Sequence, residues 1–436
     1  MAAESLVAHR GRILHCLGDP GEEADPAAVE YFSDGVLMVD AGRIVDLGPA
    51  ASVLPKYPGD VTLTEHRGNL LIPGMIDCHV HYPQIDIIAS CGDQLLDWLN
   101  HYTFPVESRF DDSDEALSVA EFFLDELLRN GTTTALVFAT VHPQSVDAIF
   151  AAALKRNMRL VAGKVLMDRN CPEALQDDAA SAYRDSRELL ERWHGQGRLH
   201  YAITPRFAPT CSDAQLAAAG KLAAEFPETL VHTHLAENID EVAWVADLFP
   251  ASRSYLDVYK QAGLLRERSV FAHCLHLDEQ DYVDLAAAGG AMAFCPTSNL
   301  FLGSGLFDLA RARGHRIRVG LGTDVGGGTS LGMLRTMSEA YKVLQLNRQT
   351  LSSYRALFLV TLGAAEALYM DERIGNFALG KDADFITLNY DSTPLMQRRL
   401  EHAEELTEEL FVLIMLGDDR AISAAYVMGE LAYSKE

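Results

Sequence analysis

The sequence predicts an α/β fold: a (β/α)8 barrel of the TIM type that carries a small composite β-sandwich domain. Two observations lead to this class. Between about residues 71 and 370, short apolar strands alternate with amphipathic helical stretches in about eight β/α units. On either side of that region, the chain consists of short β-rich runs and tight turns. We therefore expect a small-domain part over 1–70, the barrel over 71–370 and a second small-domain part over 371–436.

Barrel strands are expected where an apolar, β-branched run follows an amphipathic stretch. The first candidate covers 71–76, and clear helical periodicity follows in stretches such as 113–128 and 214–225. The remaining candidate strands are 133–138, 160–166, 199–203, 230–234, 270–273, 291–294 and 318–321. A doubly wound sheet is the alternative. It would usually bring a glycine-rich phosphate turn after an early strand, and the sequence has none there.

The two ends of the chain are predicted to share one small β domain. Residues 35–45 have the pattern of a hairpin around Asp40-Ala41-Gly42, and 383–388 and 424–433 show the same alternation of short strands and tight turns. A single domain assembled from both termini explains this likeness economically.

Composition and charge favour a cytoplasmic enzyme that acts on a small molecule. The 436 residues carry a formal net charge of −26, which repels nucleic-acid backbones and anionic membrane surfaces. The seven cysteines form no C-x-x-C pair, which suits a reducing compartment. The first residues lack the pattern of a secretion signal, and no run approaches the roughly 18 to 20 apolar residues of a membrane span.

Candidate metal ligands lie at the ends of predicted strands, where βα loops build the active site of a barrel. His79 and His81 follow the first strand, and alternate residues of an extended chain point to the same side. His234 closes the fifth strand and Asp324 follows the eighth. Neutral imidazoles with one carboxylate are typical of a catalytic metal site. His232 shares the strand alternation of His234 and could also face inward.

Residues 73–81, Pro-Gly-Met-Ile-Asp-Cys-His-Val-His, resemble the P-G-x-x-D-x-H-x-H opening of the amidohydrolase superfamily. Residues 374–384 resemble the return of that superfamily's chain into its composite β domain, so the resemblance spans nearly the whole sequence. It implies Zn2+ bound by His79, His81, His234 and Asp324, with His273 beside the metal-bound water. Some members take iron, so zinc is expected and iron is the alternative. The resemblance also implies a homodimer.

The resemblance further implies one metal ion per chain. Relatives with two ions usually bridge them through a carboxylated lysine at the end of the fourth strand, whereas here that strand runs into Thr204-Pro205-Arg206-Phe207. Lys164 lies on the third strand, where we expect a structural role. We also expect structural roles for His142, His200 and His276.

Glu237 points to deamination. It follows His234 in an H-x-x-E pattern that resembles the mononuclear zinc deaminases of the superfamily, in which this glutamate shuttles the proton. Zinc lowers the pKa of its water from about 15.7 towards 7, and Asp324 and His273 would orient the resulting hydroxide. Attack at an amidine-like ring carbon, with proton delivery by Glu237, releases ammonia. The alternative is that Glu237 only favours a helix start.

Further segments resemble the branch of the superfamily that deaminates guanine. They are Gln84, residues 95–105 with Trp98, residues 167–170 and residues 204–207. Arg206 can donate to a carbonyl such as guanine O6, the Gln84 amide can both donate and accept, Phe207 could stack on the purine and Trp98 could wall the pocket. Alternatively, Phe207 and Trp98 belong to the core and Arg206 to a structural ion pair.

The expected reaction is the hydrolytic deamination of guanine to xanthine and ammonia. Deamination of 8-oxoguanine or hydrolysis of a triazine-like ring would use the same groups, and an inactive barrel scaffold is a third possibility, although no ligand is missing. Residues 295–299 have a pattern that looks common to the superfamily. His402-Ala403-Glu404 matches half of the cytidine-deaminase signature, but the chain has no P-C-x-x-C, so we interpret it as a charged helix face.

Overall fold

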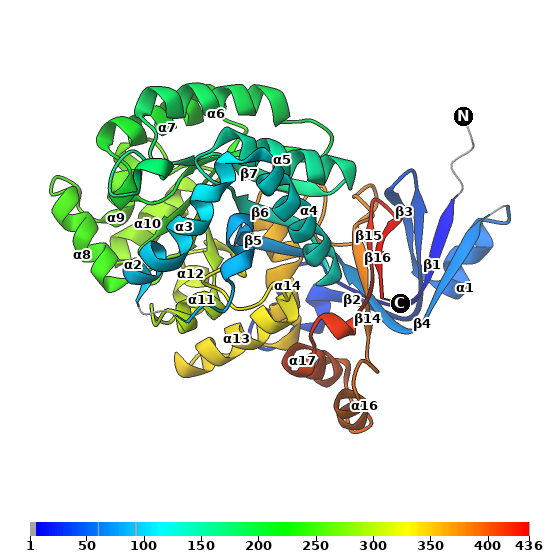
Figure 1. Ribbon diagram of the computed structural model, residues 1–436. Coiled ribbons are helices and arrows are strands. Elements are labelled where there is room, and N and C mark those ends of the chain that lie inside the picture. Colours follow the sequence, from blue (N-terminus) through cyan, green and yellow to red (C-terminus); the bar gives the residue numbers. More distant parts are fainter. Residues whose placement is uncertain (1–5, 60, 92–93, 436) are drawn as a thin grey trace.

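The computed structural model describes residues 6–59, 61–91 and 94–435, and it shows a barrel beside a smaller sheet domain (Figure 1). Residues 1–5, which the expected lack of a secretion signal concerns, lie outside the described residues. Within the described ranges, no helix has both the length and the apolar character that a membrane crossing requires.

The larger unit is a nearly closed barrel of parallel strands, as predicted. Its strands lie in the order β5, β6, β7, β9, β10, β11, β12, β13, and β8 pairs with β9. Their bounds are β5 Met75–His81, β6 Thr132–Phe138, β7 Arg159–Gly163, β8 Val165–Leu166, β9 Leu199–Pro205, β10 Leu230–Leu235, β11 Ser269–His273, β12 Ala291–Phe294 and β13 Arg318–Leu321. The ring closes just after β13, where the Asp324 N–H donates to the His79 carbonyl and the His81 N–H donates to the Val325 carbonyl, both at 2.8 Å.

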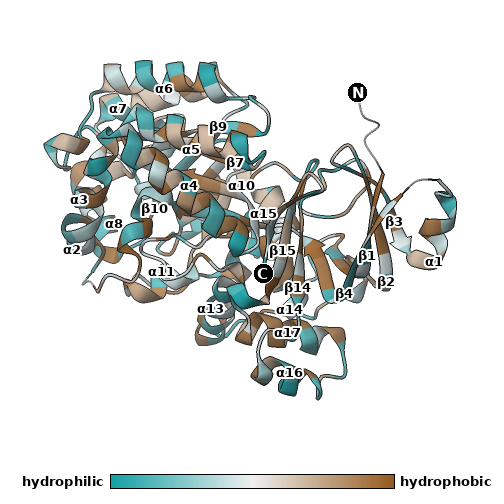
Figure 2. Ribbon diagram, turned by 45° about the vertical axis from the view of Figure 1, so that its right-hand side comes forward, coloured by the Kyte–Doolittle hydropathy of each residue, from teal (hydrophilic) through white to brown (hydrophobic). Residues whose placement is uncertain are grey.

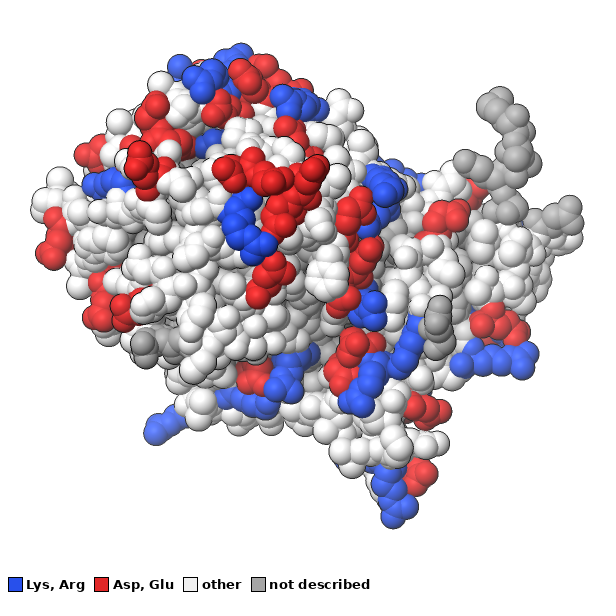
Figure 3. Space-filling model, in the orientation of Figure 1, with Lys and Arg blue, Asp and Glu red and all other residues white. Residues whose placement is uncertain are grey.

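Helices surround the barrel, and an amphipathic one such as α4 (Ser113–Arg129) buries one apolar stripe against the strands. They are α4 Ser113–Arg129, α5 Pro143–Lys155, α6 Ala179–Trp193, α7 Asp213–Glu225, α8 Ile239–Leu248, α9 Tyr255–Gln261, α10 Glu279–Ala288, α11 Pro296–Phe301, α12 Leu309–Gly314, α13 Met333–Leu346, α14 Ser353–Val360 and α15 Leu362–Ala367. On the face shown in Figure 3, lysines and arginines lie among acidic side chains. Pairs such as Lys155 with Glu121 join α5 to α4.

The strand expected over 71–76 is in fact two strands in two different sheets. β4 (Thr62–Pro73) belongs to the small domain, and β5 begins at Met75. A Cβ on the intervening Gly74 would lie 2.1 Å from the Thr133 hydroxyl oxygen, so only glycine fits where the chain crosses between the sheets. The run is apolar and buried throughout, so its hydropathy contains no sign of the change.

Both ends of the chain contribute to the small domain, as predicted. Its sheet has the order β16-β15-β14-β4-β1-β2-β3. The new strands are β1 Val7–Cys16, β2 Val29–Asp40, β3 Arg43–Pro49, β14 Phe385–Asn389, β15 Ile422–Val427 and β16 Glu430–Ser434, with the short helix α1 (Ala50–Val53) after β3. The sheet curls until its ends meet, since the Ala383 N–H donates to the Gly42 carbonyl at 2.9 Å and the Gly429 N–H to the Ala383 carbonyl at 2.8 Å. Figure 2 shows many apolar residues within β2 and β14, whereas α6 contains many hydrophilic residues.

Two helices interrupt the C-terminal part of this domain, and the sequence analysis did not predict them. α16 (Pro394–Leu400) and α17 (Leu406–Leu416) lie between β14 and β15, and α17 packs against α13 and α14 of the barrel. His402 and Glu404 therefore lie in the exposed turn between these helices, not on a helix face. The interpretation of that motif as non-catalytic does not depend on this correction.

A buried network of ion pairs joins the small domain to the N-terminal ends of the barrel strands. Arg159 begins β7 and pairs with Asp382, and Arg198 lies directly before β9 and pairs with Asp382 and Asp384. The Asp382 side chain is only 1% exposed, and Arg43 of the small domain also pairs with it. These contacts explain why the Gly380–Asp384 segment carries two aspartates.

A histidine pair in the small domain is expected to make the protein less stable in acid. His9 Nδ1 lies 3.1 Å from His66 Nε2, and both side chains are buried. Burial lowers the pKa of His9 from 6.5 to about 3, with a further contribution from His66, and lowers the pKa of His66 to about 4. The unfolded chain takes up protons below pH 6.5 while the folded protein resists them. The stability that the neutral pair contributes is therefore complete above pH 6.5 and falls as the pH drops towards 4 and 3.

At pH 5 the loss in the free energy of unfolding should be about 2 kcal/mol for His9. Urea unfolding at pH 8 and pH 5 measures it, and His66→Asn, which keeps a polar partner for His9 but does not titrate, should show a smaller difference between the two pH values. Equal losses in the variant and the unmodified protein would contradict the assignment.

Candidate active site

The predicted ligands meet at the C-terminal end of the barrel. His79 and His81 lie on one side of β5 and His234 on β10, while Asp324 follows β13. His81 Nε2 is 3.2 Å from Nε2 of both His79 and His234, and Asp324 Oδ1 is 3.1 Å from His79 Nε2 and 3.3 Å from His81 Nε2. One donor atom from each of the four residues lies within 4.8 Å of the others.

These separations fit the first coordination sphere of a single metal ion. Four donors at 2.0–2.1 Å around one zinc ion stand about 3.4 Å from each other. Burial lowers the pKa of His79 and His234, and it lowers the pKa of His81 to about 3, so all three imidazoles are neutral, as ligation requires. Burial disfavours a charged Asp324, but His79 and His81 hold the pKa of this carboxyl well below its usual value, so it remains ionised.

Residues behind the ligands fix their orientation. The His234 Nδ1–H donates to the Arg206 carbonyl at 2.7 Å, which leaves the Nε2 lone pair facing the cluster. His79 Nδ1 lies 2.7 Å from His232 Nε2, so His232, which could have been a ligand, instead supports His79 from behind. Asp77 accepts the backbone N–H groups of His79 at 3.1 Å and Thr323 at 3.0 Å, which ties β5 to the segment after β13.

Several site residues have a backbone conformation that side chains rarely adopt. φ is 70° at His273, 51° at Asp324 and 49° at Ala236, each just beyond or at the end of a barrel strand. Such left-handed conformations cost free energy in non-glycine residues and concentrate at functional sites. They turn the strand ends inward, so that side chains from separate loops meet at one point.

Glu237 and His273 lie beside the ligand cluster. His273 Nε2 is 3.4 Å from Glu237 Oε2 and 3.7 Å from Asp324 Oδ2, and the Ser304 hydroxyl donates to Glu237 Oε1 at 3.4 Å. The His273 Nδ1 is 2.9 Å from Asn299 Oδ1, which gives Asn299 an orienting contact within the 295–299 segment. Burial, reinforced by Asp324, raises the pKa of Glu237 well above its usual value. A carboxyl in this environment can hold a proton near neutral pH and transfer it.

The sequence analysis missed Glu241, which anchors the backbone of Glu237. One Glu241 oxygen accepts the N–H groups of Glu237 at 2.8 Å and Asn238 at 3.1 Å, and the other accepts the Tyr255 hydroxyl at 2.7 Å. Asn238 and Glu241 form a capping box at the start of α8. The N-x-x-E spacing was visible in the sequence as a helix-start signal, but it does not reveal the contact with Glu237.

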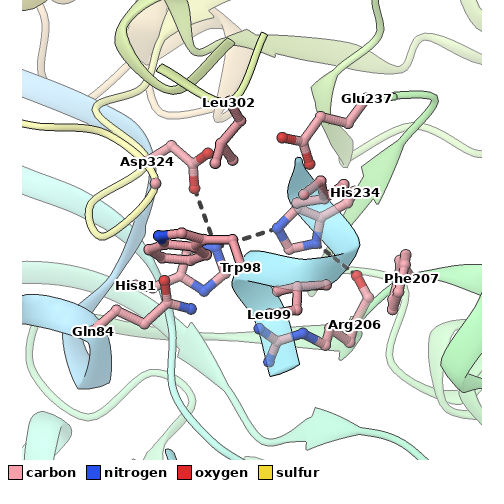
Figure 4. Close-up of a pocket in the computed structure, with 12 residues that line it drawn as sticks. His81, Gln84, Trp98, Leu99, Arg206, Phe207, His234, Glu237, Leu302 and Asp324 are labelled. Carbon is pink, nitrogen blue, oxygen red and sulfur yellow. Dashed lines mark hydrogen bonds and ion pairs between the residues drawn. The ribbon is translucent and has the colours of Figure 1, made fainter. Parts of the chain in front are cut away.

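The predicted substrate residues surround one pocket together with three of the four predicted ligands (Figure 4). Gln84, Trp98, Arg206 and Phe207 line it, as does Glu237. The other lining residues are His81, Leu95, Leu99, His234, Leu302, Asp324 and Gly327. The segment over 95–107 forms α2 (Leu95–Trp98), a π-helical turn and α3 (Phe104–Glu107), and its side chains close one side of the pocket.

Trp98 and Phe207 belong to the apolar core and also line the pocket, so both alternatives from the sequence apply to them. They are 2% and 4% exposed and belong to an apolar cluster around the pocket, which they also line. Arg206 likewise lines the pocket while its guanidinium forms a buried ion pair, Nη1 to Glu107 Oε2 at 2.6 Å. Glu107 was not predicted as a site residue. The segment 95–105, which resembles the guanine-deaminating branch, ends two residues before it.

Three of the four residues expected to be structural make polar contacts with the protein through their side chains. The Lys164 ammonium pairs with Asp177. His200 Nε2 lies 3.1 Å from Arg159 Nη1, and His276 Nε2 lies 2.9 Å from the Ser304 carbonyl oxygen. His142 is half-buried, and it precedes α5 without a side-chain capping bond.

Comparison with known proteins agrees with the barrel and its site. A profile of the Amidohydrolase family matches residues 70–431. A guanine deaminase of Escherichia coli is 50% identical over 434 residues, covering 99% of this chain and 98% of the relative. The solved structure of E. coli guanine deaminase matches with a TM-score of 0.96, covering 98% of this chain and all of the other. A guanine deaminase from C. acetobutylicum with bound guanine in its active site has a TM-score of 0.90 at 28% identity, covering 98% of this chain and all of the other. The chain therefore belongs to the guanine deaminases of the amidohydrolase family.

Proposed function

We propose that this enzyme hydrolyses guanine to xanthine and ammonia. The observation that carries the proposal is one pocket lined by Glu237, with its raised pKa, by members of the ligand cluster and by the purine-recognition candidates Arg206 and Gln84. The E. coli relative is a guanine deaminase at 50% identity, and the C. acetobutylicum structure contains guanine, which supports the same substrate here.

We propose one Zn2+ per chain, held by His79, His81, His234 and Asp324, with iron as the alternative. Three neutral imidazoles and one carboxylate, with four donor separations of 3.1–3.3 Å, support a single ion. A zinc ion in this position supplies hydroxide near neutral pH, because zinc strongly lowers the pKa of water.

The chain's own residues then direct the chemistry. Asp324 Oδ2 and His273 Nε2 lie 3.7 Å apart beside the ligand cluster, where they would orient the attacking water and hold the second of its two protons. Glu237 carries the first proton of the water to the ring nitrogen beside the carbon that bears the exocyclic amine. The second proton passes to that amine as its bond to the ring carbon breaks, and the amine leaves as ammonia.

Purine recognition follows from the other side of the pocket. Arg206 has N–H groups beyond the one bound by Glu107 and can donate to the guanine carbonyl oxygen. The Gln84 amide can donate and accept along the base edge, while Phe207 and Trp98 offer flat apolar surfaces. Deamination of 8-oxoguanine or of a triazine-like ring needs the same groups, so the substrate panel below includes both. Cytoplasmic location and a homodimer stay predictions.

The test is ammonia release from guanine, 8-oxoguanine and an aminotriazine, with metal content measured in the same preparation. We expect guanine to have the highest kcat/KM, with activity lost on dialysis against dipicolinate and restored by Zn2+. Preferential turnover of the triazine, or full activity in a protein freed of metal, would overturn the proposal.

A further inference from the structure

Glu107 connects the two polar groups that are placed to recognise the base. Its Oε1 accepts the Gln84 side-chain N–H at 2.8 Å, and its Oε2 accepts the Arg206 Nη1–H at 2.6 Å. The Glu107 side chain is fully buried and lies outside the pocket lining, whereas Gln84 and Arg206 line the pocket. One carboxylate therefore sets the positions of both groups.

The contacts also fix which way the Gln84 amide faces. Its Nε2 is bound by the Glu107 carboxylate, which can only accept, and its Oε1 accepts the Gly326 N–H at 3.2 Å. Rotating the amide by 180° would place Oε1 against the Glu107 carboxylate and Nε2–H against the Gly326 N–H. Both contacts would be repulsive. Within the described part of the chain, the Gln84 amide makes only these two hydrogen bonds, so its second Nε2–H and second Oε1 lone pair can bind a ligand.

The same carboxylate sets the charge that a ligand meets. Among the described residues that line the pocket, Arg206 is the one lysine or arginine. Its guanidinium is buried, and without a partner a buried cation would strongly attract an anion. Paired with Glu107, it offers N–H donors with little net charge, which suits a neutral carbonyl.

We propose that Glu107 is a positioning residue that makes the site select uncharged purines over anionic ones. It does so by fixing Gln84 and by neutralising Arg206. This inference rests on the proposed function, in that it takes the pocket to be the purine site. It assigns a specificity role to a residue that does not touch the substrate.

Two purines without an exocyclic amine serve as probes, because neither can be deaminated. Hypoxanthine is neutral near pH 7 and urate is an anion. Calorimetric titration of the metal-loaded protein gives a Kd for each purine. The ratio of these two Kd values is compared between variants, because the difference in shape between the two purines affects every variant equally. We expect Glu107→Gln to shift the ratio about tenfold towards urate, the size of one charge-assisted hydrogen bond. With guanine, KM should rise more than kcat falls, because Glu237 is unchanged.

Control variants separate this role from a purely structural one. Asp177→Asn removes a carboxylate from another buried ion pair, that with Lys164, neither member of which lines the pocket, and it should leave the ratio unchanged. Glu107→Asp keeps the charge and should still exclude urate, even if Glu107→Gln folds poorly. Adding Arg206→Met to Glu107→Gln should abolish the gain in urate binding.

An unchanged ratio in Glu107→Gln, an equal shift in Asp177→Asn or a gain of urate binding in Glu107→Asp would overturn the inference. These outcomes are distinct from failure of the proposed function, which would appear as an unmodified enzyme that does not deaminate guanine.

Discussion

Glu237→Gln is expected to lower kcat for guanine by about 10²–10⁴-fold, the usual contribution of a positioned acid–base group. The amide is nearly the same size as the carboxyl and can still meet the Ser304 hydroxyl, so the pocket should keep its shape. It cannot carry the proton from water to the ring. The metal ligands are untouched, so metal content and guanine binding should stay near those of the unmodified enzyme.

Stopped-flow or steady-state assays of ammonia release measure the loss, and calorimetry and metal analysis on the same protein measure what is kept. Glu188→Gln makes the same chemical change on an exposed position of α6 and should have no effect. Turnover by Glu237→Gln at the unmodified rate would remove Glu237 from the mechanism. A loss of metal in this variant would show that the defect is structural.

Asp382→Ala should have the largest effect on stability. The change leaves Arg159 and Arg198 in a buried position with one carboxylate between them, and breaking a buried ion pair from one side typically costs about 3–5 kcal/mol. The network lies at the opposite end of the barrel from the ligands, so the kcat of the folded fraction should not change.

Urea unfolding gives the change in free energy, and activity per folded molecule tests the separation of the two ends. Asp418→Ala is the matched control, because Asp418 pairs with Arg420 on the surface, where such a pair contributes about 1 kcal/mol or less. If Asp382→Ala were as mild as Asp418→Ala, the small domain would not depend on this network.

The sequence predicted what depends on local pattern. Strand alternation placed His79 and His81 on one side of β5, and the order of strands around a barrel brought His234 and Asp324 to them. These inferences need only periodicity and chain direction. The composite domain could also be predicted from the sequence, because both termini show the same short-strand pattern.

What the sequence could not predict depends on contacts between distant segments. Glu107 acquires its role only when α3 is placed between the loops that carry Gln84 and Arg206, and no local signal distinguishes it from a surface glutamate. The same holds for Asp382, whose buried partners Arg159 and Arg198 are more than a hundred positions away. The boundary at Gly74 was missed because a strand of one sheet runs directly into a strand of another, with no polar residue between them.

The hydrogen bonds between β5 and the segment after β13 tie metal loading to folding. His79 and His81 are translated early. Asp324 reaches them only when the last barrel strand docks onto the first and the Asp324 N–H binds the His79 carbonyl. A chain halted before that strand has imidazoles but no complete coordination sphere. An ion bound by all four residues would therefore hold the segment after the last barrel strand to the first strand, and we expect tight retention of the ion only in a barrel that has closed.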